Sequence, residues 1–158
     1  MKVGNWMELA EEHGVANYIL KAQTGHINIS PTGFQLAAQD YFKCYLDFQM
    51  PGRFSIVPYF LCCRAIELSL KAKHLEIRSR QVVKQSFGHN LIKSYQALPS
   101  EKQSLSSEEF QLLQKANEIY NKKEFEYFSV LDAATGFTRY PDLNKLADIT
   151  RKLIDYKS

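Results

Sequence analysis

The chain has 158 residues, of which 45% are hydrophobic and 13% aromatic, so it can bury the core of one ordinary domain. Its seven Gly and five Pro residues are far fewer than a fibrous or disordered chain would carry. The formal net charge of +3 is too small to argue for wrapping a nucleic-acid backbone by overall charge, so such a function requires a local basic patch.

The cysteines indicate a reducing compartment. Cys44, Cys62 and Cys63 are odd in number, and the side chains of an adjacent pair diverge on a helix, so we expect reduced, buried thiols.

Acidic residues interrupt the N-terminal region where an export signal would be apolar, and the uncharged run from Phe54 to Cys63 is about half a membrane span. These features predict a cytoplasmic protein that does not cross a membrane.

Helical periodicity dominates the sequence, and six helices are predicted. The first runs from about Trp6 to Lys21, after a capping-box spacing between Asn5 and Glu8. The second begins at Ser30-Pro31, a polar cap followed by Pro at the first helical position, and runs to about Met50. Its predicted inner face is rich in aromatic residues.

The third predicted helix, from Ser55 to about Ile77, is apolar on most of its circumference, which marks it as the central and most buried helix. Residues 78–87 are expected to form a polar linker. A short helix from His89 to Leu98 is predicted to follow, ending before Pro99.

The fifth helix is predicted from Ser106 to Tyr120, with Glu109 completing a capping box. Residues 124–141 give no clear prediction. Asp142 is the expected cap of a last helix from Leu143 to about Tyr156. Short connections between amphipathic helices favour a single all-α domain over residues 1–158, an antiparallel bundle of five to six helices.

The third helix carries one polar stripe on an otherwise apolar surface: its members recur at intervals of three and four, and they are Arg64, Glu67, Lys71, His74 and Arg78. Such a stripe should face water, a groove or a partner. It can be a solvated seam with an ordinary Glu67–Lys71 ion pair. It can also be a groove in which Arg64 and Lys71 bind an anion such as phosphate while Glu67 orients them, or a dimer seam.

Two further places are candidates for ligand contact. His89 is expected at the start of a helix, where free backbone amides can hold an anion, although it can equally cap or pack locally. Arg139 and Tyr140 combine a cation with an aromatic ring, a pairing suited to a base and its phosphate, or they are a solvated Arg beside a packed Tyr.

Motifs of the familiar metal and cofactor enzymes are not found. The sequence has no Gly-rich phosphate loop, paired-Cys zinc spacing or dinucleotide-binding fingerprint. The histidines His13, His26 and His74 lack the mutual spacing of a metal site. We therefore expect no metal and no cofactor.

Four short stretches resemble the HEPN superfamily of small helical-bundle domains: Val57–Leu61, Cys63–Ala72, Gly88–Leu91 and Arg139–Pro141. The resemblance covers about Thr32 to Asp155, so residues 1–30 would be a helical N-terminal extension. It implies a HEPN-like bundle. Members of this superfamily include metal-independent ribonucleases of toxin–antitoxin and defence systems, nucleotide-binding modules, and non-catalytic members that dimerise or accompany nucleotidyltransferases.

The ribonucleases of that superfamily carry an Arg followed after four to six residues by a His, and this chain departs from the pattern. Arg64 precedes His74 by ten residues, Arg80 precedes His89 by nine, and no His follows Arg139. The resemblance therefore implies a non-catalytic member.

The expected function is that of a HEPN-like homodimer that binds a nucleotide, an RNA or a protein partner such as a nucleotidyltransferase. The expected ligand-binding residues are Arg64, Glu67, Lys71, His89, Arg139 and Tyr140. One alternative is a ribonuclease with a rearranged site, in which His89 or His74 is the general acid or base and an Arg stabilises the phosphate. Another is a purely structural dimerisation module.

Overall fold

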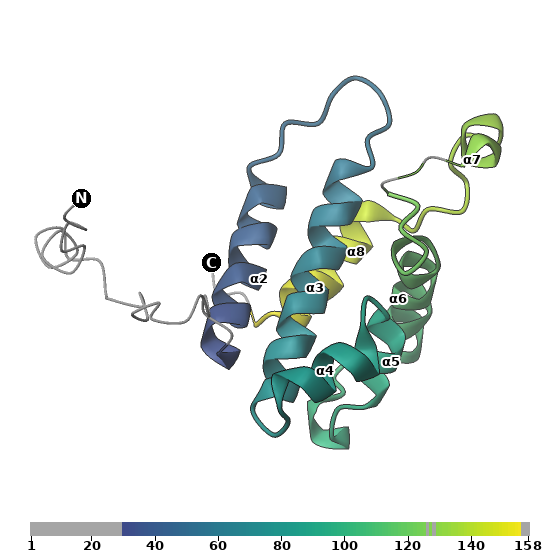
Figure 1. The fold of residues 1–158 in the computed structure, drawn as a ribbon. Helices are drawn as coiled ribbons and strands as arrows, with labels where there is room; N and C mark the ends of the chain where they lie inside the picture. The colour runs from purple at the N-terminus through teal and green to yellow at the C-terminus, as the bar shows by residue number, and fades with distance from the viewer. Residues whose placement is uncertain (1–29, 126, 128, 156–158) are drawn as a thin grey trace, which may run out of the picture.

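Helix α3, Val57–Leu75, is the centre of the bundle in the computed structural model (Figure 1). The structure describes residues 30–125, 127 and 129–155, which form α-helices and one 3-10 helix and contain no strand. The other elements are α2 (Pro31–Leu46), α4 (Arg80–Phe87), α5 (Leu91–Gln96), η1 (Ser100–Lys102), α6 (Ser107–Tyr120), α7 (Val130–Ala134) and α8 (Leu143–Leu153). The predicted helix from Trp6 to Lys21 lies outside the described residues.

The prediction of an all-α bundle with a central third helix is confirmed, because α3 contacts α2, α4, α5, α6 and α8. Its side chains Ile66 and Leu70 are fully buried. Helix α2 runs antiparallel beside it and contributes the fully buried Phe42 from the predicted aromatic face (Figure 1). Burial of each such side chain stabilises the fold by about 1.5–3 kcal/mol relative to exposure.

Three of the predicted helix starts are confirmed in their hydrogen bonds. The Ser30 hydroxyl accepts from the Gly33 amide at 3.1 Å, and the Asp142 carboxylate accepts from the Lys145 amide at 2.9 Å. Ser106 and Glu109 form the complete capping box. These caps satisfy amides that have no partner within the helix, which is why their short sequence signals are dependable.

The expectation of a polar linker over residues 78–87 was wrong, because α4 occupies most of it. Ser79 caps α4 by accepting from the Val82 amide, and Val83 and Phe87, one turn apart, are buried. Gly88, with a φ of +54°, ends the helix in a conformation that favours glycine. As a result α4 lies across one end of α3 (Figure 1).

The cysteine prediction is confirmed for two residues and wrong for the third. Cys62 and Cys63 are buried in α3, and burial raises the pKa of Cys62 to about 12, so its thiol stays protonated. Cys44 is exposed because it lies on the outer face of α2. No helix within residues 30–155 that the structure describes is long and apolar enough to span a bilayer.

Candidate anion-binding site

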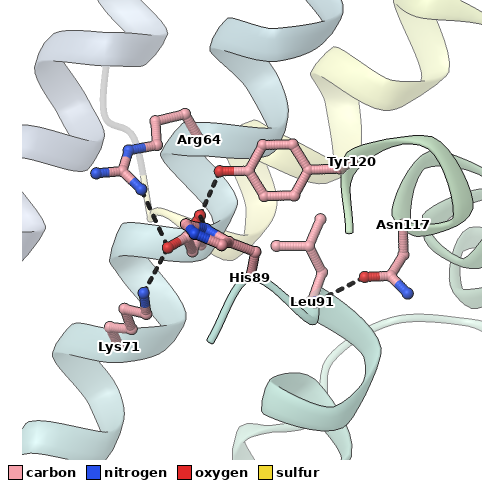
Figure 2. A network of polar contacts seen from close by, with 7 residues as sticks. Arg64, Lys71, His89, Leu91, Asn117 and Tyr120 are labelled. Atoms are coloured by element: carbon pink, nitrogen blue, oxygen red, sulfur yellow. Dashed lines mark hydrogen bonds and ion pairs between the residues drawn. The ribbon is translucent and has the colours of Figure 1, made fainter. Parts of the chain in front are cut away.

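A buried carboxylate organises the most elaborate polar cluster of the described chain. Glu67, on α3, is only 3% exposed. One of its oxygens, Oε1, accepts from Arg64 Nη1 at 3.1 Å and from Lys71 Nζ at 2.5 Å. The other, Oε2, contacts His89 Nδ1 at 3.1 Å and accepts from the Tyr120 hydroxyl. Figure 2 shows these four side chains converging from three parts of the chain.

Glu67 is charged despite its burial. Burial alone would raise its pKa, but hydrogen bonds from Lys71 and Tyr120 and the charges of Lys71 and Arg64 outweigh it, so the pKa is lowered. Burial and the neighbouring carboxylate raise the pKa of Tyr120, so its hydroxyl remains a donor. A charged carboxylate can only accept, so the contact with His89 requires a proton on Nδ1.

The four partners of Glu67 come from three parts of the chain. Arg64 and Lys71 lie about one turn before and after it on α3, and Tyr120 is the last residue of α6. His89 lies between α4 and α5, where the side-chain oxygen of Asn117 accepts from the Leu91 amide at 2.8 Å (Figure 2). That bond ties the start of α5 to α6 two residues after His89, which restricts where the imidazole can lie.

Two cavities open beside this cluster. The first, here called the basic cavity, has a volume of about 380 Å³ and lies between α3 and α4. Its polar lining consists of four cationic side chains and one imidazole, with no carboxylate: Arg64, Lys71, Arg80, Lys84 and His89. Apolar side chains complete the lining. A cavity lined by one sign of charge attracts ligands of the other sign, so this one suits an anion.

The second, here called the aromatic cavity, has a volume of about 220 Å³. Its rings come from α2, α3, α6 and the segment after α6, and they are Tyr41, Phe60, Tyr120 and Phe125. Arg64, His89 and Lys123 also line it, and the two cavities adjoin at Arg64 and His89. Aromatic faces of this kind suit a planar ring.

The structure brings four of the six predicted ligand-binding residues together. Arg64, Lys71 and His89 line the cavities, and Glu67 lies beneath and orients them. The Glu67–Lys71 ion pair of the solvated-seam interpretation is present, but that interpretation was wrong about solvation at Glu67 and His74. Helices α4, α5 and α6 pack on α3, and both of these side chains are buried.

His74, the fourth member of the stripe and one of the two histidines considered for acid–base chemistry, is fully buried. The expectation that it faces water, a groove or a partner was wrong. Its ring stacks on Phe87 at 4.2 Å between centroids, and Nε2 donates to the Ser94 carbonyl at 2.8 Å. Burial lowers its pKa, so the ring is neutral and belongs to the core.

Arg139 and Tyr140 lie outside the Glu67 cluster. The Arg139 guanidinium donates to both oxygens of Asp132, at 2.5 and 2.6 Å, and also to Glu124. Tyr140 packs edge-on against Phe54, with 5.0 Å between centroids. These contacts occupy the guanidinium with two carboxylates, so in this structure Arg139 holds residues 124–140 together.

Several cavity residues were missed from the sequence. Arg80 and Lys84 were assigned to a linker, although the Ser79 cap and the spacing of Val83 and Phe87 could have identified α4. Tyr120 was predicted only as the end of the fifth helix, and no local signal pairs it with Glu67, which is 53 positions away.

Comparison with known proteins adds no relative. No family model, no curated protein and no solved structure matches this chain. The HEPN resemblance therefore stays an expectation from the sequence, and the chemistry of the site has to be inferred from its own residues.

Proposed function

We propose that the protein binds a phosphate-bearing ligand, a nucleotide or a single strand of RNA, without cleaving it. The observation that carries this proposal is the adjacency of the basic and aromatic cavities, which share Arg64 and His89. Lys and Arg side chains bind phosphate oxygens, and aromatic side chains stack on unpaired bases. One ligand that has both parts can fill both cavities.

Glu67 orients the side chains of Arg64 and Lys71 for such a ligand. A guanidinium has five N–H donors and an ammonium three, so Arg64 and Lys71 each keep donors free after bonding to Glu67. The carboxylate also fixes both side chains before a ligand arrives, which reduces the entropy lost on binding. The side chains of Arg64 and Lys71 are 29% and 16% exposed, so both can reach a ligand.

The test is a thermal-shift measurement with AMP, ATP and a short single-stranded RNA. A ligand that binds only the folded protein raises Tm, and Lys71→Ala should lose most of that increase. Lys115→Ala is the matched control, because Lys115 is an exposed lysine of α6 away from both cavities. If the Kd is micromolar, a ligand at about a hundred times that concentration should raise Tm clearly. No increase in Tm with any of the three ligands at that concentration would reject the proposal.

A second candidate, cleavage of RNA, is favoured by the contact between His89 and Glu67. A carboxylate that holds Nδ1 leaves the opposite ring nitrogen available for proton transfer, and the imidazole is 48% exposed. Arg64 and Lys71 would then stabilise charge on the phosphate. This alternative predicts that wild-type protein cleaves RNA in EDTA and that His89→Ala does not. Intact RNA after incubation with wild-type protein would reject it.

A further inference from the structure

We infer that the ligand is a nucleoside polyphosphate, a free nucleotide with two or more phosphates, rather than a nucleic-acid strand. This inference rests on the proposed function and narrows its ligand class.

Arg80 and Lys84 lie one turn apart on the exposed side of α4, and both line the basic cavity. Neither has an ion pair with any carboxylate in the described part of the chain. Like charges at this spacing repel and weaken a helix. Their placement at the cavity beside Arg64 and Lys71 therefore costs stability that a bound anion would recover.

The basic cavity carries more positive charge than one phosphate group would neutralise. Four cationic side chains line it, and Glu67, beneath Arg64 and Lys71, offsets one of their charges. An internal RNA phosphate carries about one negative charge, and a terminal phosphate about 1.5 to 2. The cavity therefore keeps three positive charges that Glu67 does not offset. A diphosphate or triphosphate carries enough negative charge to balance them.

The arrangement of the two cavities also favours a nucleotide over a strand. Proteins that bind single strands spread their cations along a groove and stack successive bases on several aromatic platforms. Here the cations of α3 and α4 converge on one cavity of about 380 Å³, within the size range of whole-ligand pockets, next to one smaller aromatic cavity. This geometry matches one base with several phosphates.

The test is calorimetric titration of the full chain, in EDTA so that each polyphosphate keeps its full charge, with AMP, ADP, ATP, inorganic tripolyphosphate and a 5′-hydroxyl RNA octamer. Each added phosphate should tighten binding about tenfold, because each gains charge-assisted hydrogen bonds. ATP should bind more tightly than the octamer. Tripolyphosphate should bind more weakly than ATP, because it has no base for the aromatic cavity.

The decisive variant is the double change Arg80→Ala with Lys84→Ala, which alters only exposed side chains. It should lose the ATP preference and leave the affinity for AMP within about threefold, since AMP is held by Arg64 and Lys71. The matched control removes two exposed charges elsewhere, Lys115→Ala with Lys145→Ala, and should behave as wild type.

Equal affinity for AMP and ATP, tighter binding of the octamer than of ATP, or equal weakening of every probe in the double variant would overturn the inference and leave the proposed function intact. If tripolyphosphate binds as tightly as ATP, the inference that the ligand contains a nucleoside would be overturned. If no probe binds wild-type protein, the proposed function itself fails.

Discussion

Among single residues, the buried and charged carboxylate of Glu67 is the one on which the candidate site depends. Glu67 is stable in the interior because Arg64, Lys71, Tyr120 and His89 surround both of its oxygens. A buried charge without such partners would be neutralised or would unfold the protein. The cluster is therefore a condition for the fold as well as the support of the site.

Replacing Glu67 by Gln should lower the free energy of unfolding by about 2–3 kcal/mol, because it leaves two partly buried cations without their counter-charge. Urea unfolding measures the loss. Glu118→Gln, at an exposed position of α6, is the control and should change little. Equal stability of Glu67→Gln and wild type would show that the cluster does not support the fold.

His74 should make the protein less stable in mild acid. Burial is the main reason that its pKa lies below the ordinary 6.5, so the unfolded chain binds more protons than the folded one below that pH. The free energy of unfolding therefore falls as pH decreases through about 6.5, until the lowered pKa of the folded state is reached.

The test is urea unfolding of wild type and His74→Gln, which keeps a donor toward the Ser94 carbonyl, at about pH 7.5 and about pH 5.5. The loss on acidification should be smaller in His74→Gln than in wild type. An unchanged loss in His74→Gln would contradict this explanation.

At the scale of elements, Arg139 fastens the segment between α6 and α8. Its bond to Glu124 joins the two ends of that segment, and its bond to Asp132 reaches α7, where Asp132 is 1% exposed. Arg139→Gln should leave Asp132 as a buried charge without its partner and open the segment locally. Hydrogen exchange should then be faster over residues 124–140 and unchanged in α3. Unchanged protection of residues 124–140 would contradict the fastening role.

The sequence predicted the helices whose signals are local. Caps at Ser30, Ser106 and Asp142 were found because each satisfies amides within its own first turn. Helix α4 was missed because its eight residues have a mostly polar composition, so tertiary packing of Val83 and Phe87, and not a long apolar stripe, accounts for its burial. The segment before α8 gave no clear prediction because ion pairs of Arg139 and contacts between aromatic rings determine its structure, and not a helical pattern.

Much of the candidate site could also be read from helical spacing, which correctly placed Arg64, Glu67 and Lys71 on one face of α3. Spacing could not show which elements cover that face, so the burial of His74 and the contact with Tyr120 were missed. Nor could it show that Arg139 is occupied by two carboxylates from its own segment. These are long-range or mutual contacts that no single stretch encodes.

For the molecule as a whole, we propose that one end of the bundle, between α3 and α4, binds an anionic ligand. The most direct measurement is an amide NMR titration of the full chain with ATP. The account predicts that the largest chemical-shift changes fall within residues 64–71, 80–89 and 120–125, around the two cavities. Changes confined to other surfaces, such as the cavity beside Pro31 and Asp155, or no changes at all, would contradict it.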